Sequence, residues 1–383
     1  MFTPPHVAPL SPPPRTLMGP GPSEVHPEVL EVMSKPLVGH LDPAFIEIMD
    51  EVQELLRYAF QTANEWTIPV SGTGSAAMEA AIGNVVVPGD TVLVPGNGYF
   101  GERMAQMAER AGGDVSVIEG RWGEPIDIDT LQTAVDETDP DVVCLVHAET
   151  STGVLQHDLA KAADIVHENG GLLIVDCVTS LGGVELRVDE WGIDVAYSGP
   201  QKCLSCPPGA SPLTLNDRAM EKIEAREEPM RCWYLDLQLI ADYWGSDRSY
   251  HHTAPITNVY AIREALRLVA EEGLEARWDR HEQIASSLVE QLEALGLDTY
   301  VSSEDWLPTL TTIQVPDSVD DNAVIEQLRT SAGIEIAGGL GSMAGEIWRI
   351  GCMGHSAREE NISLLVDAMA SSLEDQGFEP MVD

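Results

Sequence analysis

The sequence predicts an α/β protein with a large domain, built on a mostly parallel sheet, and a small C-terminal α+β domain. At 383 residues the chain is too long for one ordinary hydrophobic core. From about residue 23 to residue 272, short apolar runs alternate with helical patterns, and beyond that the order changes. We therefore expect an N-terminal arm over residues 1–22, a large domain over 23–272 and a small domain over 273–383.

The strands expected in the large domain are short, apolar and rich in branched residues, as strands buried on both faces should be. They are Trp66–Val70, Val92–Val94, Val142–Val146, Leu172–Val175 and Val195–Tyr197. Helical patterns lie between them, for example over Ser75–Asn84 and Leu159–Asn169. Such alternation indicates a parallel sheet with helices on both faces.

The ends of the chain follow other patterns. Prolines at 12–14 and the run Gly19–Pro22 exclude a helix in the arm. In the small domain, a long helix from about Trp278 should stop at Gly296. Strands are expected over 310–315 and 347–350. A final helix should begin with a capping box made by Ser356 and Glu359.

The charge is extreme, because 63 acidic residues face 21 basic ones and leave a net charge of −42. The acids are dispersed along the chain, which favours a surface adapted to concentrated salt, as in a halophilic source. Nucleic-acid binding is disfavoured because phosphate backbones require basic patches. The chain has neither an apolar run of about 18 residues nor an apolar signal core, so we expect a cytoplasmic protein without a membrane span.

The six cysteines are scattered, and buried free thiols are the simplest interpretation. Cys203 and Cys206 form a C-x-x-C sequence next to Lys202. A zinc site would require a second pair at suitable spacing, so no metal site is expected. A redox role for this isolated pair has only weak support.

The stretch from Leu172 to Lys202 carries the strongest chemical signal. Asp176 ends one apolar strand, and Lys202 lies in a Gly/Pro-rich turn just past the next one. This is the pair that pyridoxal phosphate chemistry requires: a lysine to hold the cofactor as a Schiff base, and an acid to keep its pyridine nitrogen protonated. A lone acid at a strand end more often makes a cap or a turn. The presence of Lys202 after the next strand favours a functional role for Asp176 over that structural one.

The run Ser71–Ser75 follows a predicted strand and opens a predicted helix. Its small residues allow backbone N–H groups to approach a phosphate at the helix N-terminus. The spelling Gly72-x-Gly74-x-x-Ala77 also fits a loose dinucleotide fingerprint. However, the acid that this fingerprint needs after the next strand is missing, so a nicotinamide site is disfavoured.

Three further positions have both a structural and a functional interpretation. Arg349 lies in an apolar strand-like run, where it could pair with an acid of the chain or clamp a substrate carboxylate. Tyr250–Thr253 is either a surface loop or a phosphate contact. Phe100 either stacks on a planar cofactor or packs in the core.

Taken together, these residues resemble the class V, fold-type I aminotransferases, and most of all the alanine–glyoxylate / serine–pyruvate aminotransferases. The resemblance covers nearly the whole chain. The stretches that carry it are Gly19-Pro-Gly-Pro-Ser23, Ser71-Gly-Thr-Gly74, Ser151-Thr-Gly-Val-Leu-Gln156, Val175-Asp176, Ser180-Leu-Gly-Gly183, Tyr197-Ser-Gly199, Gln201-Lys202, Pro207-Pro-Gly209, Tyr250-His-His-Thr253, Gly338-Gly-Leu-Gly341 and Arg349-Ile-Gly351.

The resemblance implies transamination between a small amino acid (alanine or serine) and a small 2-oxo acid (glyoxylate or pyruvate), by a ping-pong mechanism through a Lys202 aldimine. It implies that Asp176 pairs with the pyridinium and that Arg349 binds the substrate carboxylate. The phosphate would be held by Gly74, Ser75 and Gln201, joined by Tyr250 and Thr253 of a second subunit. Ser151 would contact the ring's phenolic side. It therefore also implies a homodimer with shared active sites, in which the arm wraps the partner.

This chain departs from the family pattern at the ring and at the phosphate loop. Phe100 stands where the family often has a tryptophan stacked on the ring, and Ser75 replaces a histidine common in animal members. Cys203 and Cys206 stand where other small residues are expected. We expect stacking to survive, because phenylalanine is also a flat aromatic surface.

Other functions remain possible on the same residues. A lyase or a cysteine desulfurase would use the same cofactor, and the desulfurase would need a mobile nucleophilic cysteine, for which Cys352 is the one candidate. A nicotinamide-dependent oxidoreductase would use Gly72–Ala77. A non-catalytic protein with the same fold is the third alternative.

Overall fold

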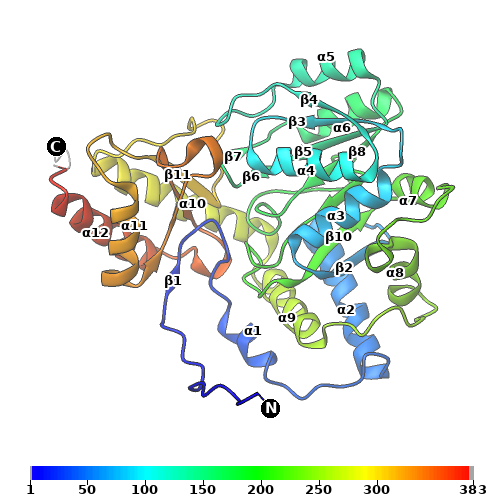
Figure 1. The fold of residues 1–383 in the computed structure, drawn as a ribbon, viewed down its shortest axis with the longest axis horizontal. Coiled ribbons are helices and arrows are strands. Elements are labelled where there is room, and N and C mark those ends of the chain that lie inside the picture. The colour runs from blue at the N-terminus through cyan, green and yellow to red at the C-terminus, as the bar shows by residue number, and fades with distance from the viewer. Residues whose placement is uncertain (1, 379–383) are drawn as a thin grey trace.

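A seven-stranded sheet forms the centre of the larger of two lobes (Figure 1). The structure is a computed structural model that describes residues 2–378; Met1 of the expected arm and residues 379–383 of the expected small domain lie outside the described residues. Across the sheet the strands follow the order β2 (Trp66–Gly72), β10 (Gly209–Leu215), β9 (Val195–Tyr197), β8 (Leu172–Asp176), β5 (Val142–Val146), β3 (Thr91–Pro95) and β4 (Asp114–Ile118). Every strand except β10 runs parallel to the others, which confirms the predicted α/β class.

Strand β10 was not among the expected strands, and its position explains why. Pro212 lies in its middle, and a proline in a central strand lacks the N–H that a ladder needs. In the sheet, Pro212 stands opposite Pro69 of β2, so the two prolines share one gap in the ladder. On the other side the carbonyl of Pro212 accepts a hydrogen bond from Ser198 N at 2.8 Å.

Nine α-helices accompany this sheet within the described part of the larger lobe. They are α1 (Pro27–Val32), α2 (Pro43–Phe60), α3 (Gly74–Val85), α4 (Tyr99–Ala111), α5 (Ile128–Thr138), α6 (Leu159–Glu168), α7 (Asp217–Glu224), α8 (Leu237–Trp244) and α9 (Ile256–Glu272). Several begin at side-chain caps: Asp42 accepts from Ala44 N at 2.9 Å with Pro43 in the first turn, and Asn216 accepts from Ala219 N at 3.0 Å. Helix α2 packs on α9, α3 on α4, and α5 on α6.

The smaller lobe has its own hydrophobic core around Trp348 and Ile350. Its antiparallel sheet has the order β11 (Leu310–Gln314), β14 (Ile347–Gly351) and β13 (Ala337–Gly338), with α10 (Leu274–Ala294), α11 (Asp321–Gln327) and α12 (Glu359–Asp375) around it. Helix α10 links the lobes, because Leu274 belongs to the larger core, whereas Leu288 belongs to the smaller one. No helix among residues 2–378 is long and apolar enough to cross a membrane.

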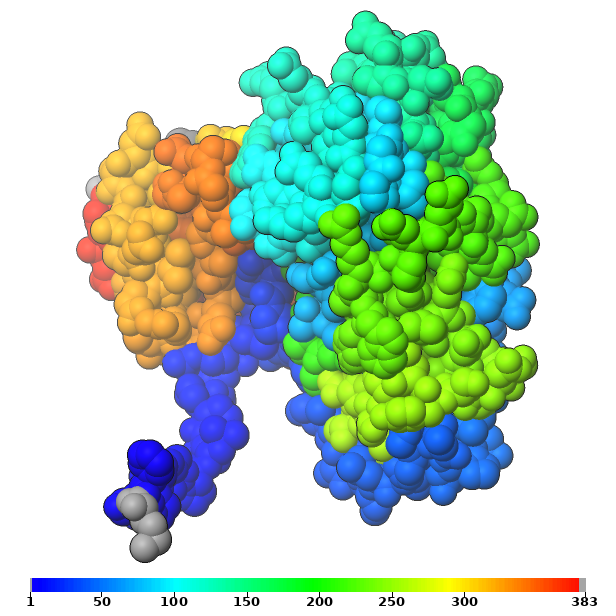
Figure 2. All heavy atoms as spheres, turned by 45° about the vertical axis from the view of Figure 1, so that its right-hand side comes forward, coloured from blue at the N-terminus to red at the C-terminus, as the bar shows by residue number. Residues whose placement is uncertain are grey.

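The N-terminal arm passes from the smaller lobe to the larger one (Figure 1). Its strand β1 (Thr16–Leu17) runs parallel to β12 (Ile334–Glu335), and Met18 is fully buried in the smaller core. Five residues later, Ser23 N donates to Gln201 O at 2.8 Å in the larger lobe. Figure 2 shows that the residues before β1 extend away from the body of the chain.

The predicted capping box at the last helix is wrong. Helix α12 begins at Glu359 with Arg358 in the cap position, and no side chain caps it. Ser356 lies instead in a short 3-10 turn, where its Oγ accepts from Glu24 N of the arm at 3.0 Å. Glu359 accepts from Ser287 Oγ at 2.7 Å. Ser356 and Glu359 therefore bond to distant segments of the chain and not to the first turn of α12.

This reassignment predicts different effects for two alanine substitutions. Ser356→Ala leaves Glu24 N without its partner and should lower the free energy of unfolding by about 1–2 kcal/mol. Glu359→Ala removes an exposed contact and should cost only about 0.5 kcal/mol. Denaturant unfolding in concentrated KCl measures both. A larger loss for Glu359→Ala than for Ser356→Ala would contradict the reassignment.

Candidate active site

The candidate site lies where the parallel strands β5, β8 and β9 end, the edge at which open α/β sheets bind ligands. Asp176 is the last residue of β8 and stands opposite Tyr197 at the end of β9. The chain after β9 turns sharply and reaches Lys202. Arg349 comes from β14 of the smaller lobe. The larger lobe therefore supplies Asp176 and Lys202, and the smaller lobe supplies Arg349.

Asp176 is a buried carboxylate, 2% exposed, that is held by two donors. Val178 N donates to its Oδ1 at 2.8 Å, and the Tyr197 hydroxyl donates to its Oδ2 at 2.7 Å. Burial raises the pKa of Asp176 to about 6, although these hydrogen bonds and the nearby charges of Lys202 and Arg103 oppose the rise. Within residues 2–378 no basic side chain forms an ion pair with Asp176, so its remaining acceptor capacity suits a cationic ligand.

Lys202 differs from the other three lysines of the chain. Lys35, Lys161 and Lys222 form ion pairs with Glu31, Asp158 and Asp90. Lys202 is 7% exposed, and in the described part of the chain it pairs with no carboxylate. Burial lowers its pKa to about 8, so the neutral amine is far more accessible near neutral pH than in an ordinary lysine.

The arm covers Lys202. The Lys202 Nζ donates to the carbonyl of Pro20, and Ser23 Oγ donates to the carbonyl of Lys202 at 2.6 Å. Gly21 has a φ of +116°, and a Cβ placed there would lie 2.7 Å from Lys202 Cδ. A glycine is therefore required at this position for two reasons: its backbone angle and the close approach of the lysine side chain.

Arg349 is buried at 5% exposure without an acidic partner among the described residues, so the salt-bridge interpretation of this residue is wrong. Its Nε donates to Gly338 O at 2.8 Å, and its Nη1 lies 3.3 Å from Thr150 O. Burial lowers the pKa of Arg349 to about 10, which still leaves it charged at neutral pH. A buried guanidinium without a carboxylate is costly in free energy unless a ligand supplies the anion.

The expected phosphate residues meet at the N-terminus of α3. Gly74 is the first residue of this helix, no side chain caps it, and Ser75 is the second. A Cβ on Gly74 would lie 3.9 Å from Gln201 Nε2, which places the Gln201 amide over this end of the helix. Gln201 Oε1 is buried without a hydrogen-bond partner. Free N–H groups at this helix end, with the Gln201 Nε2 donor beside them, suit an anion.

Glu149 is a buried residue that sequence reasoning missed. It ends the short strand β6 (Ala148–Glu149), accepts from Ser151 Oγ at 2.5 Å and Ser151 N at 3.0 Å, and accepts from Phe100 N at 3.2 Å. Tyr99 N donates to Ser151 Oγ at 3.0 Å. Glu149 and Ser151 thus satisfy the first N–H groups of α4, where Gly98 offers no cap. A Cβ on Gly98 would lie 2.3 Å from Glu149 Cγ.

This arrangement fixes Phe100 in the first turn of α4, half-buried and with the guanidinium of Arg103 5.0 Å from its ring centre. Burial raises the pKa of Glu149 to about 7, and its hydrogen bonds with Ser151 oppose the rise. The signal that could have found Glu149 is its position just after the central strand β5. One acid among 63 carries little information without that context.

Tyr250 and Thr253 are exposed in this chain, on the loop that precedes α9. Their neighbour His252 approaches Ser71 Oγ at 2.6 Å, so the loop lies beside the end of β2 that leads into the phosphate loop. Neither side chain contacts Gly74 or Gln201 in the hydrogen bonds of residues 2–378. Their role in a neighbouring subunit stays a prediction.

The donor set fits pyridoxal phosphate. A buried carboxylate with no ion pair in residues 2–378 suits a protonated pyridine nitrogen, a buried amine suits Schiff-base formation, and the α3 N-terminus with the Gln201 Nε2 donor beside it suits a phosphate. Asp176, Lys202, Gly74, Ser75 and Gln201 are the residues that would hold the group.

The raised pKa of Asp176 predicts that this residue destabilises the cofactor-free protein. From about pH 4 to pH 6 the folded state binds the extra proton, so its relative stability falls as pH rises through this window. Asp176→Asn should therefore increase the free energy of unfolding by about 1–3 kcal/mol above pH 7 and by almost nothing near pH 4. Thermal unfolding of cofactor-free protein across this range is the measurement. Asp164→Asn, on the exposed face of α6, is the control, and an equal effect of the two changes at all pH values would refute the argument.

The sequence profile "Aminotransferase class-V" matches residues 17–365. The chain is 41% identical over 377 residues to a (S)-ureidoglycine–glyoxylate transaminase of Bacillus subtilis (strain 168), covering 94% of this chain and 90% of that protein. It is 40% identical over 370 residues to an alanine–glyoxylate aminotransferase of Oryctolagus cuniculus, covering 96% and 94%.

Solved structures agree with this result. The structure of an alanine–glyoxylate aminotransferase from Nostoc sp. has a TM-score of 0.95 and 52% identity, over 96% of this chain and 97% of that chain. A pyridoxamine–pyruvate aminotransferase from Mesorhizobium loti has a TM-score of 0.91 and 26% identity, over 100% and 96%. The fold is therefore that of the fold-type I aminotransferases, and the chain belongs to the class V family of pyridoxal-phosphate-dependent aminotransferases.

Proposed function

We propose that this aminotransferase moves an amino group between a small amino acid, alanine or serine, and a small 2-oxo acid, glyoxylate or pyruvate. The observation that carries the proposal is a single-carboxylate site: Arg349 is buried and has no acidic partner among residues 2–378. The names of the relatives support glyoxylate as acceptor, since both curated relatives and the Nostoc protein are named for it. The amino donors in these names differ: ureidoglycine for the Bacillus subtilis protein and alanine for the other two.

Lys202 and Asp176 have distinct roles in the proposed reaction. When bound, pyridoxal phosphate supplies an electron sink for the electron pair left at the substrate Cα. Asp176, fixed by Val178 N and the Tyr197 hydroxyl, would hold the positive charge on the ring nitrogen. Lys202 would accept the Cα proton at Nζ and return it, because its lowered pKa of about 8 makes the amine a base suited to neutral pH.

Arg349 would bind and orient the substrate's α-carboxylate. Its Nε is held by Gly338 O, and its Nη1 faces Thr150 O, so the guanidinium plane is set before the substrate arrives. The arm residues Pro20 and Gly21 cover Lys202 and exclude water from the reacting atoms. The remaining expected roles, Phe100 on the ring and Ser151 on its phenolic side, belong to the same proposal.

The desulfurase alternative lacks its nucleophile. Cys352 is fully buried, and burial raises its pKa to about 12, so no thiolate is available. Cys203 is also fully buried, with its Sγ 3.3 Å from Thr179 O and a pKa raised to about 12. Buried inert thiols are the better interpretation of both.

We further propose a homodimer and a cytoplasmic location. The arm residues before β1 are exposed and include the apolar Phe2, Val7 and Leu10. Trp233 and Tyr250 are also exposed, near the loop that approaches Ser71. Apolar surface of this kind favours a partner, and a second copy would bring Tyr250 and Thr253 to a phosphate site. The six free cysteines support a reducing compartment.

The first test uses the absorbance of the cofactor-loaded protein in concentrated KCl. The wild type should show a band at about 420 nm that L-alanine or L-serine removes and glyoxylate or pyruvate restores. Lys202→Ala should lack this band and turnover. Arg349→Gln should keep the band but need about 30-fold more amino acid, because a charged pairing is lost.

Arg329→Gln is the control for Arg349, since Arg329 is an exposed arginine of the smaller lobe that pairs with Glu326. It should behave like the wild type. Transamination that persists in Lys202→Ala would sink the proposed mechanism. A band that neither amino acid changes would assign the enzyme to other substrates.

A second test addresses assembly and salt. A net charge of −42 should be tolerated where the screening length is about 3 Å, near 1 M salt, but not where it is about 10 Å, near 0.1 M. Light scattering should give two chains per particle in molar KCl, with dissociation and unfolding as the salt is removed. A single chain at all concentrations would contradict the dimer, and stability independent of salt would contradict the halophilic origin.

A further inference from the structure

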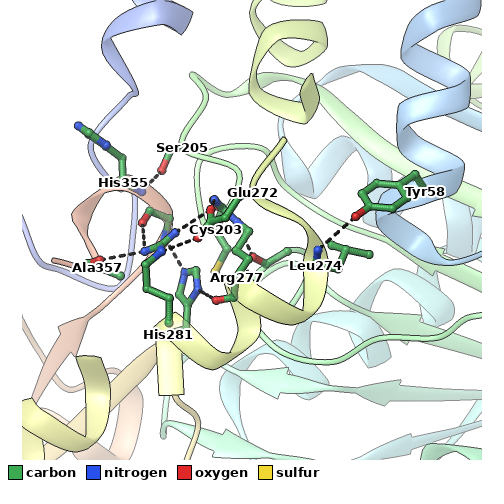
Figure 3. Close-up of polar contacts among 12 residues, drawn as sticks. Tyr58, Cys203, Ser205, Glu272, Leu274, Arg277, His281, His355 and Ala357 are labelled. Carbon is green, nitrogen blue, oxygen red and sulfur yellow. Dashed lines mark hydrogen bonds and ion pairs between the residues drawn. The ribbon is translucent and has the colours of Figure 1, made fainter. Parts of the chain in front are cut away.

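The two lobes join at a short break between two helices. Helix α9 ends at Glu272, Gly273 has a φ of +85°, and α10 begins at Leu274. Helix α9 belongs to the core of the larger lobe, whereas α10 continues into the core of the smaller one. Four charged or polar residues around this break form a cluster that we name the joint cluster: Glu272, Arg277, Arg280 and His281. Figure 3 labels Glu272, Arg277 and His281 of this cluster.

Arg277 of the joint cluster holds the loop that carries Lys202. Arg277 is 6% exposed, its Nε donates to Gly182 O at 2.8 Å, and its Nη2 donates to Cys203 O at 2.5 Å. Cys203 is the residue directly after Lys202. Figure 3 shows the Arg277 guanidinium reaching from α10 to this carbonyl. One rigid fork therefore fixes the backbone next to the lysine.

Arg280 holds the segment that follows Arg349. Its Nη1 donates to Gly354 O at 3.0 Å and to Ala357 O at 2.9 Å. Gly354 lies three residues beyond the end of β14, the strand that presents Arg349. One turn of α10 thus connects the lysine of one lobe to the arginine of the other.

Glu272 joins the two arginines. It accepts from Arg277 Nη1 at 2.5 Å and from Arg280 Nε at 2.6 Å. Burial alone would raise the pKa of Glu272, but the hydrogen bonds and charges of Arg280 and Arg277 outweigh it and lower the pKa to about 2. His281 completes the joint cluster, because its Nε2 accepts from Gly354 N at 2.8 Å and its Nδ1 donates to Arg277 O at 2.7 Å.

The two held segments also touch each other. His355 N donates to Ser205 Oγ at 2.6 Å. Gly354 has a φ of +54°, and a Cβ placed there would lie 2.1 Å from Ser205 Oγ and 2.6 Å from Cys203 O. The Lys202 loop and the segment after β14 are therefore in direct contact, and the joint cluster forms hydrogen bonds to both from α10.

We propose that the joint cluster positions Lys202 relative to Arg349, with Arg277 setting the lysine and Arg280 setting the substrate clamp. None of the four residues is catalytic in itself, because each acts through the backbone of a neighbouring segment. The proposal rests on the proposed function of Lys202 and Arg349. Arg277 holds the Lys202 loop and Arg280 holds the segment after β14, so their substitutions should have different effects.

Arg277→Met and Arg280→Met separate the two roles. In Arg277→Met, amide hydrogen exchange over Pro200–Cys206 should be about tenfold faster. The pH midpoint of the cofactor absorbance should shift, and kcat should fall about 10–100-fold with little change in KM. In Arg280→Met, exchange should be faster over Gly354–Ala357, the absorbance titration should match the wild type, and the amino-acid KM should rise about tenfold.

Arg267→Met is the matched control. Arg267 lies on α9 and pairs with Glu28, Glu264 and Glu271, none of which belongs to the Lys202 loop. It should lower the unfolding temperature without changing loop exchange, absorbance or KM. If Arg277→Met lowers only the unfolding temperature, as a purely structural residue would, the proposal is overturned.

One further variant and one further measurement keep the proposal testable. If Arg277→Met does not fold, Arg277→Lys keeps the charge but cannot reach both carbonyls, and it should shift exchange and absorbance in the same direction by less. An Arg277→Lys protein identical to the wild type overturns the proposal. Exchange in cofactor-free protein tests the grip on the loop directly, so a wild type that binds no cofactor would defeat the proposed function and not this measurement.

Discussion

The burial of three ionisable side chains without ion-pair partners is the constraint on which the rest of the structure depends. Asp176, Lys202 and Arg349 are each less than a tenth exposed, and none has an oppositely charged partner within ion-pair distance in residues 2–378. Unpaired buried charges are costly in free energy. The surroundings supply hydrogen bonds to Asp176 and Arg349, and in the proposed function the cofactor and the substrate would supply the missing charges.

Those surroundings come from distant parts of the sequence. The parallel strands bring Asp176 and Tyr197 to one edge of the sheet. The arm, anchored by Met18 in the smaller lobe and Ser23 in the larger, covers Lys202. The joint cluster then ties the lysine loop to the segment that follows Arg349. The site is thus an interlobe structure, whose geometry depends on contacts that lie far from the reacting atoms.

The parts of the site that sequence reasoning predicted are those set by local pattern. Asp176 and Lys202 could be placed because a buried strand and the turn after it are readable from a few residues, and Arg349 because an arginine in an apolar run stands out. Strand β10 was missed because Pro212 argues against a central strand, and its compensation lies opposite, at Pro69. The capping box failed because the arm competes for Ser356.

The remaining features depend on contacts between distant segments. Glu149 is one acid among many until β6 places it against α4. In the sequence the joint cluster looks like ordinary surface charge on a helix. The contact between Arg277 and Cys203 forms only when the chain folds. The predicted phosphate contacts of Tyr250 and Thr253 lie in another copy of the chain, so the structure of one chain does not test them.

The central claim is that one lysine of the four is prepared to hold the cofactor. The most direct measurement is borohydride reduction of the protein with pyridoxal phosphate in concentrated KCl, followed by mass mapping of the peptides. With one equivalent of pyridoxal phosphate per chain, modification should fall on Lys202 rather than on Lys35, Lys161 or Lys222, because only Lys202 lies beside Asp176 and the α3 N-terminus, whereas the other three pair with acids outside the site. Modification that spares Lys202, or that spreads evenly over the four lysines, would contradict this claim.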